Sequence, residues 1–347
     1  MRRALVIVGV IALLGVAIGL IVWRGPDWHS VHDAFTAVTW SWVFAAIGLN
    51  LLSVIARSLS WNICIEQSLA PPRPAFPLVF SAFCVGLFGN AVLPGRVGEL
   101  ARVAVLRRHM PGRKGATATL LGSVFAHRMF DLFPAVTLVV WVLFTAKIPR
   151  WAYTSLAIVI VVGSLLFLFT VLLARRQHRE LEGVGRMRQL LARARQGLAV
   201  MRKPIPALEA TVFQFMGWGC QLFAVWAAMR AFNIHEPLPA AGLVLVLMNV
   251  ATIFPVWPGN VGLVQIAVAT PLVGYGVPYA QGIAFGIGLQ AIEASVGIGI
   301  GLVFLAREGL SYATLKHFEE EAEESLEAGE LEVPPLEPER ERARSVG

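Results

Sequence analysis

Charged residues are scarce in this chain. Only 15% of its 347 residues are charged, whereas 56% are hydrophobic, and the mean hydropathy is +0.68. A soluble globular domain carries about 25% charged residues, so this scarcity excludes an ordinary soluble protein and indicates an integral membrane protein. The expected fold class is an all-α polytopic membrane protein.

Cysteine and histidine are also rare. Cys64, Cys84 and Cys220 each lie in apolar segments without CxxC spacing or neighbouring histidines, which favours packing roles over a disulfide or a metal site. The seven histidines are scattered among unrelated segments, and no GxxxxGK[ST] loop for nucleotide phosphates is present. We therefore expect no metal, no cofactor and no catalytic constellation.

Long apolar runs, by contrast, are abundant. A helix needs about 20 apolar residues to cross a hydrocarbon core of roughly 30 Å. The run that follows Met-Arg-Arg is too long for a secretion signal and lacks a small-x-small cleavage site, so we interpret it as a retained helix. The sequence predicts full crossings near 4–23, 41–63, 116–147, 152–174, 206–231 and 280–306.

Basic residues gather in the connections between these runs. Arg2 and Arg3, the cluster RRHMPGRK at 107–114, and a loop with nine lysines and arginines at 175–203 are the basic connectors. The positive-inside rule places them, and both chain termini, on the cytoplasmic side of the inner membrane. The spacing of Leu and Met in the loop also suits an amphipathic surface helix. Topology explains these charges, so we expect no nucleic-acid partner.

Acidic residues are concentrated at the other end of the chain. From Ser311 onward there are 11 of the 22 acidic residues and only 4 of the 29 basic ones. Such a segment is too polar to bury a core and predicts a disordered tail, either simply solvated or bound to a partner. The expected parts are a first membrane half, a basic cytoplasmic amphipathic loop, a second membrane half and an acidic cytoplasmic tail: 1–174, 175–205, 206–310 and 311–347.

Two further apolar segments, 76–108 and 238–277, each contain a Pro-Gly break. The first reads PGRVG at 94–98 and the second PGNVG at 258–262, so four of five residues match. According to the predicted crossings, segment 76–108 begins at the cytoplasmic side of the membrane and segment 238–277 at the opposite side. This opposite orientation is typical of an inverted repeat, in which the helix breaks form the substrate site. Re-entrant hairpins and closely paired full spans both fit this count. The break residues are Pro94, Gly95, Gly98, Pro258, Gly259 and Gly262.

Charged residues follow the first break directly. A helix that restarts after Gly95 directs free N–H groups and its positive dipole end toward an anion such as phosphate. Arg96 and Arg102 add forked donors suited to phosphate oxygens, and Glu99 lies three residues from each, on the same helical face. The alternative is that these three side chains extend to the interface and only pair with one another.

Other charges lie within predicted spans. Arg57 has no obvious local partner, which makes it a candidate ligand for the substrate phosphate. Arg128 is a further candidate ligand, although Arg128 and Asp131 are three residues apart and also suit a structural pair. Glu99 or Asp131 would position the arginines or change protonation. Asn260 in the second break is a further candidate for substrate contact. Glu293, the lone acid of the last span, is better interpreted as a packing group than as a proton-responsive one.

Three stretches together, LPGRVGELAR, HRMFDLF and FPVWPGNVGLVQ, resemble the lysylphosphatidylglycerol synthase transmembrane-region family over roughly residues 1–310. The second motif departs from the family pattern, because Asn260 and Gln265 stand where the family tends to have glycine and glutamate. A role that needs a carboxylate there is in doubt. The residues that match the first motif are Pro94, Gly95, Arg96, Gly98, Glu99 and Arg102.

The resemblance implies a lipid translocase. Synthase members of the family also carry a large soluble transferase domain, and the residues after Leu310 are too few and too acidic to form one. The expected substrate is a membrane phospholipid or a polyprenyl-phosphate lipid, and a homo-oligomer is compatible with these features. The alternatives are an integral-membrane enzyme that uses His127, Asp131 and Glu99 on lipid head groups, and a transporter of a small soluble anion.

Overall fold

The computed structural model describes residues 27–92, 98–111, 113, 116–147, 161, 165, 199–252 and 260–315. Within these ranges the secondary structure is helical and contains no strand, which confirms the predicted all-α class. The helices in chain order are α2 (Trp28–Thr36), α3 (Trp40–Ser68), α4 (Phe76–Val92), α5 (Gly98–Arg108), α6 (Ala116–Thr145), the short 3-10 helix η2 (Ala199–Arg202), α9 (Pro204–Ala231), α10 (Leu238–Ala251), α11 (Leu263–Val273) and α12 (Tyr279–Arg307).

Four of the helices are long and apolar enough to cross a membrane. They are α3, α6, α9 and α12, and each contains 28 to 30 residues, more than the roughly 20 that a hydrocarbon core requires. They correspond to the spans predicted at 41–63, 116–147, 206–231 and 280–306. The spans predicted at 4–23 and 152–174 lie outside the described residues, apart from Val161 and Leu165.

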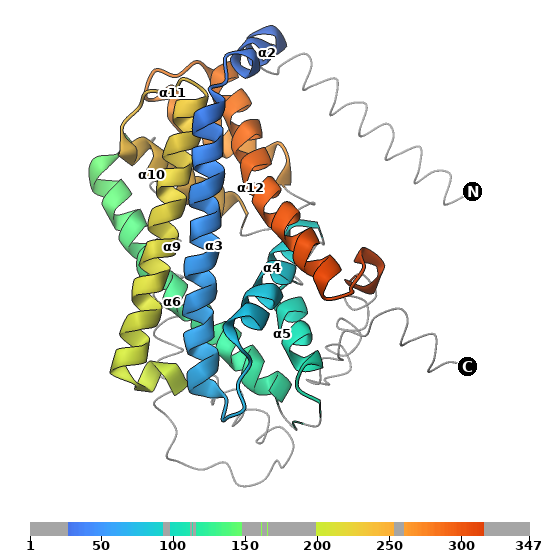
Figure 1. Ribbon diagram of the computed structural model, residues 1–347. Coiled ribbons are helices and arrows are strands. Elements are labelled where there is room, and N and C mark those ends of the chain that lie inside the picture. Colours follow the sequence, from blue (N-terminus) through green and yellow to red (C-terminus); the bar gives the residue numbers. More distant parts are fainter. Residues whose placement is uncertain are drawn as a thin grey trace, which may run out of the picture.

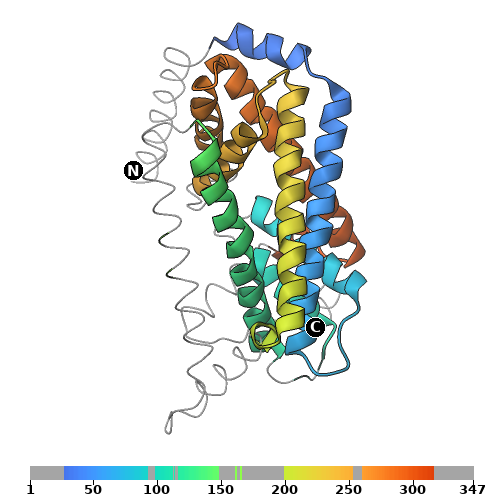
Figure 2. The ribbon, with the colours of Figure 1, turned by 90° about the vertical axis from the view of Figure 1, so that its left-hand side faces the viewer.

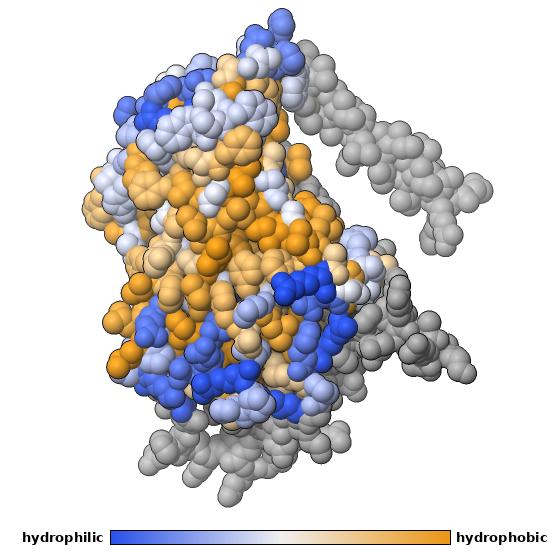
Figure 3. All heavy atoms as spheres, in the orientation of Figure 1, coloured by the Kyte–Doolittle hydropathy of each residue, from blue (hydrophilic) through white to orange (hydrophobic). Residues whose placement is uncertain are grey.

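The surface of the bundle matches this assignment. Figure 3 shows a band of apolar residues around the middle of the molecule and hydrophilic residues toward both ends. Large apolar side chains of the long helices are exposed, including those of Phe44 and Leu52 of α3 and Val303 of α12. Such a continuous exposed apolar surface is typical of a protein whose solvent is lipid.

Four shorter helices, of which three are apolar, form two hairpins. Helices α4 and α5 contain 17 and 11 residues, and α10 and α11 contain 14 and 11, so none is long enough to cross the hydrocarbon core alone. Within each pair the two helices pack against each other. Re-entrant hairpins and paired full spans both stay predictions. The break residues Pro94, Gly95, Pro258 and Gly259 lie outside the described ranges.

The hairpins occupy opposite ends of the bundle. In Figures 1 and 2 α4 and α5 lie in the lower half, beside the end of α3, whereas α10 and α11 lie in the upper half, beside the end of α9. The order long helix, hairpin, long helix therefore occurs twice along the chain, as α3 to α6 and as α9 to α12. Helix α12 contacts α4 as well as α11, so it joins both hairpins.

Glycine permits the close approach within the first hairpin. Gly98 at the start of α5 lies against the backbone of Gly86 and the amide of Asn90, and a Cβ at Gly98 would clash with both. Gly301 of α12 likewise lies against Phe88 of α4. Small residues at such crossings are typical of membrane helices, where close backbone packing provides much of the association energy.

The long helices α3 and α9 pack side by side along most of their length (Figure 1). Two buried serines of α3 tie them together, because Ser53 Oγ donates to Gly217 O at 2.8 Å and Ser60 Oγ donates to Ala210 O at 3.0 Å. This pair of helices forms one wall of the polar region described next.

Candidate functional site

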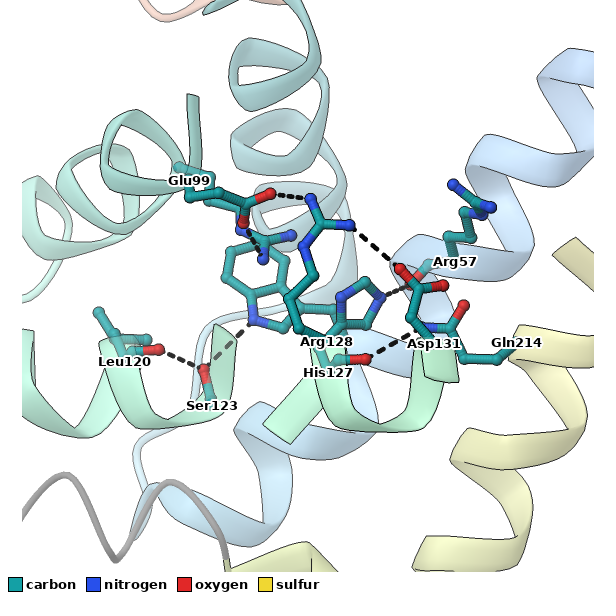
Figure 4. A network of polar contacts seen from close by, with 10 residues as sticks. Arg57, Glu99, Leu120, Ser123, His127, Arg128, Asp131 and Gln214 are labelled. Carbon is teal, nitrogen blue, oxygen red and sulfur yellow. Dashed lines mark hydrogen bonds and ion pairs between the residues drawn. The ribbon is translucent and has the colours of Figure 1, made fainter. Parts of the chain in front are cut away.

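A network of charged side chains lies between the first hairpin and α6 (Figure 4). The carboxylate of Glu99 forms ion pairs with two arginines, with Arg102 through Oε2 and with Arg128 through Oε1. Arg128 also contacts Asp131, with 3.1 Å between Nη1 and Oδ2. A single carboxylate of α5 therefore connects both charged pairs into one network.

Helical periodicity explains why these residues can meet. Glu99 and Arg102 are three residues apart on α5, and Arg128 and Asp131 are three apart on α6, so each pair shares one helical face. Helix α5 packs against α6, which brings the two faces together. The two local pairs follow from the sequence spacing, whereas the pairing of Glu99 with Arg128 is a tertiary contact that the spacing did not predict.

Arg102 is the most deeply buried member of the network. Only 4% of its side chain is exposed, and its guanidinium lies 4.5 Å from the ring centroid of Trp61 and 5.6 Å from that of Phe83. Burial of an unpaired charge is costly, and here Glu99 and the aromatic rings offset the cost. The pairing of Arg102 with Glu99 that the alternative described is present, and the Arg102 side chain is enclosed by helices.

Arg128 differs sharply from Arg102. Its side chain is 45% exposed, although it holds two carboxylates. The network thus contains one arginine side chain that is enclosed and one that is partly exposed. Arg96, Gly95 and Pro94, which the sequence also indicated, lie outside the described residues.

Arg57 approaches the same region from α3, and its partners come from α9. Its Nη2 donates to Gln221 Oε1 at 2.9 Å, and its guanidinium lies 5.2 Å from the ring centroid of Trp218. Trp218 in turn donates from Nε1 to Asp131 Oδ1 at 2.9 Å. Helix α9 therefore links Arg57 to the carboxylate that also binds Arg128.

Glu293 adds a contribution from α12. Its carboxyl lies near the side chain of Gln221, the residue that accepts from Arg57. The charge of Arg57 also acts on both Asp131 and Glu293. The polar region thus extends from the first hairpin through α6, α3 and α9 to α12, the helix that joins both hairpins.

His127 is held by backbone groups. Its Nε2 lies 3.1 Å from the carbonyl oxygen of Arg57, and because a carbonyl only accepts, Nε2 is the donor. Gln214 Nε2 donates to the His127 carbonyl at 3.3 Å. The imidazole is buried, and this arrangement orients α6 against α3 and α9. The geometry provides no support for the acid–base role considered for His127.

The described residues contain no group of three or more His, Cys, Asp or Glu side chains that could hold a metal ion. Cys64 and Cys84 are buried free thiols, and Cys220 is a partly buried one. The burial of Cys64 and Cys84 is what a packing role requires.

Comparison with known proteins decides the family. Residues 5–301 match the sequence profile described as the lysylphosphatidylglycerol synthase TM region. The chain belongs to this family. A UPF0104 membrane protein of Methanothermobacter thermautotrophicus is 23% identical over 291 residues, which cover 75% of this chain and 82% of that protein. No solved structure matches the chain significantly. The protein is thus an integral membrane protein of the lysylphosphatidylglycerol synthase transmembrane-region family.

The second hairpin of this family member is neutral, and its polar groups bind one another. Gln265 Oε1 accepts from the backbone N–H of Gly262, and Gln265 Nε2 donates to Gln290 Oε1 of α12. Gly262 has a φ of 92°, a left-handed conformation that favours glycine. Gln265 therefore caps the start of α11 and connects α11 to α12. These two hydrogen bonds are the structural role of the Gln265 amide.

Asn260 also serves the backbone of this hairpin. It is 4% exposed, and its Nδ2 donates to the carbonyl oxygen of Ala251 at the end of α10, at 3.0 Å. The amide thus spans the break between α10 and α11. A substrate contact by Asn260 stays a prediction.

The sequence interpretation of this family member missed the contribution of α9. Gln214, Trp218 and Gln221 are spaced by four and three residues and therefore lie on one face of the helix. A polar stripe at helical spacing within an apolar span was the signal that could have found them.

Proposed function

We propose that the protein is a lipid translocase, which moves the phosphate-bearing head group of a phospholipid or polyprenyl-phosphate lipid across the cytoplasmic membrane while its tails remain in lipid. The observation that carries this proposal is the network in which Glu99 is shared by the enclosed Arg102 and the partly exposed Arg128. Membership of the lysylphosphatidylglycerol synthase transmembrane-region family supports a lipid substrate.

The charges of the network suit a phosphate ligand. The ion-paired group itself is balanced, because Arg102 and Arg128 face the carboxylates of Glu99 and Asp131. Arg57 lies beside this group, and its charge acts on Asp131 and Glu293. A phosphodiester carries one negative charge, and guanidinium groups bind phosphate oxygens with two parallel donors.

The head-group phosphate would bind first to the partly exposed side chain of Arg128. A phosphate that approaches Arg128 would compete with Glu99 and Asp131 for its N–H donors, while Arg102 retains the carboxylate of Glu99. Ligand binding would thus replace one ion pair with another instead of leaving a charge unpaired, an exchange that keeps the cost of desolvation low.

The arrangement of the hairpins supports alternating access. The chain contains two units, each with a hairpin between two long helices, and the two hairpins lie at opposite ends of the bundle. Transporters built from inverted repeats share this arrangement. Helix α12 touches both hairpins, so a displacement of one hairpin would be transmitted to the other. We propose that the end with Arg107, Arg108 and Arg113 faces the cytoplasm, in agreement with the positive-inside rule.

Movement of labelled lipids tests this proposal. Fluorescent phosphatidylglycerol, phosphatidylcholine and a neutral diacylglycerol would be placed in liposomes containing the purified full-length protein, and transbilayer movement would be followed by quenching of the outer leaflet. The proposal predicts accelerated movement of at least one phosphate-bearing lipid and none of the diacylglycerol. No acceleration of any lipid would contradict it, uptake of a soluble anion would favour an anion transporter, and a chemically altered lipid would favour an enzyme.

A further inference from the structure

A basic cavity lies at the end of the bundle where α3 and α5 end, away from Glu99 at the start of α5. Its walls come from the connection between α3 and α4 and from the segment that follows α5. The cavity has a volume of about 520 Å³, which is within the range of small-molecule sites. The side chains relevant to binding are those of Arg73, Leu78, His109, Met110 and Arg113, and prolines of both segments complete the lining.

The guanidinium groups are held in place by backbone carbonyls. Arg113 donates from Nη1 to the carbonyl oxygen of Pro72 at 2.9 Å and from Nη2 to that of Ala70, so it joins the two walls. Arg73 donates from Nε to the carbonyl oxygen of Leu69 at 3.0 Å, a bond that does not use its two Nη groups. Orientation before a ligand arrives lowers the entropic cost of binding.

Among the residues that the structure describes, no acidic side chain lines this cavity. Among the described residues, Glu308 contacts His109, with 3.5 Å between Oε2 and Nε2. Its other carboxylate oxygen accepts from Ser81 Oγ at 2.6 Å, and its side chain is only 10% exposed. Glu308 is therefore committed to contacts with Ser81 and His109, and the charged side chains among the described lining residues are those of Arg73 and Arg113.

We propose that this cavity binds the phosphate-bearing head group of an anionic membrane lipid. Arg73 and Arg113 would contact the phosphate, and Leu78, Met110 and the prolines would contact the adjoining glycerol and the first methylene groups. A site for inorganic phosphate has no need of such an apolar wall, whereas an amphiphile at the membrane interface uses both kinds of contact.

The position of the cavity suggests what binding achieves. Arg102 and His109 are seven residues apart, so roughly 10 Å of helix separates the charged network from the cavity. Head groups captured here would be concentrated beside the first hairpin before they enter the network. This role as a loading site rests on the proposed function, whereas binding itself does not.

Photo-crosslinking tests the binding without a transport assay. Full-length protein in phosphatidylcholine vesicles would receive traces of phosphatidylglycerol or phosphatidylcholine with a photoreactive group near the glycerol, and crosslinked peptides would be mapped by mass spectrometry. The expected result is preferential labelling by phosphatidylglycerol of peptides that contain Leu78 and Met110. Arg73→Gln should reduce this labelling about tenfold, the size expected for one charge-assisted hydrogen bond.

Lys203→Gln is the matched control, because Lys203 lies at the same end, is bonded to Gln67 and does not line the cavity. It removes one positive charge and should leave the labelling unchanged. Equal labelling by both lipids, or full labelling of Arg73→Gln, would overturn the proposal, and so would displacement of the lipid by millimolar inorganic phosphate. Intact labelling in a protein that moves no lipid would contradict only the proposed function.

Discussion

Arg128 of α6 forms an ion pair with Glu99 of α5, and the same carboxylate neutralises the enclosed Arg102. This sharing joins the first hairpin to a membrane-spanning helix through charge instead of apolar packing alone. It also gives the two arginines different roles, since Arg102 holds Glu99 within the bundle and Arg128 presents a partly exposed side chain. The predictions below follow from this division.

Glu99→Gln should destabilise the protein strongly. The substitution leaves Arg102 enclosed without its carboxylate, and breaking a buried pair from one side costs about 3–5 kcal/mol. Arg128→Gln should cost less, because that side chain is 45% exposed. Thermal unfolding of purified variants in matched detergent checks this order. Equal stability of the two variants would contradict the different roles of Arg102 and Arg128.

Gly98→Ala should disrupt the first hairpin. The added Cβ would lie 2.7 Å from the backbone nitrogen of Asn90 and would clash with the carbonyl of Gly86, and overpacking of this kind costs about 1–3 kcal/mol or more. Gly299→Ala is the control, because no atom lies within 4 Å of the added Cβ and alanine favours a helix by up to about 1 kcal/mol. Thermal unfolding should show opposite shifts, and loss of stability in both variants would contradict the packing described for Gly98.

Trp218→Phe should weaken the link between α9 and the network. Phenylalanine keeps a ring beside Arg57 but removes the donor to Asp131, and a hydrogen bond to a charged group contributes about 1.5–3 kcal/mol. Trp226→Phe is the matched control, since the contact of Trp226 with Trp42 is between rings. Stability and lipid movement would be measured in both variants. Wild-type values for Trp218→Phe would show that the indole N–H is dispensable.

The sequence could predict most of the architecture and the local charge pairs. Four spans, the two broken segments and the spacing of Arg128 and Asp131 follow from hydropathy and helical period. The pairing of Glu99 with Arg128 and the partners of Arg57 do not. Lipid and protein interior are similarly apolar, so hydrophobic pattern does not define which faces of membrane helices meet. Polar residues at helical spacing, such as Trp218 and Gln221, carry that information.

Gln265 offers a test of the second hairpin. Gln265→Leu removes the acceptor for the backbone N–H of Gly262 and the donor to Gln290, so it should destabilise by about 1–3 kcal/mol for the unsatisfied group. Gln265→Glu retains an acceptor for Gly262 and should cost less, because the Gln290 amide can rotate to donate. Unfolding measurements that rank glutamate below leucine would contradict the capping role.

The most direct test of the central claim is the rate of phosphatidylglycerol movement in liposomes containing the wild-type protein, Arg128→Gln or Arg128→Lys. Arg307→Gln is the control, because Arg307 lies in the last turn of α12 and packs on Phe304, outside the network. The account predicts a loss of about tenfold or more for Arg128→Gln, from one charge-assisted contact, partial rescue by lysine and an unchanged rate for Arg307→Gln. A wild-type rate in Arg128→Gln would contradict the assignment of Arg128 as the group that binds the head-group phosphate.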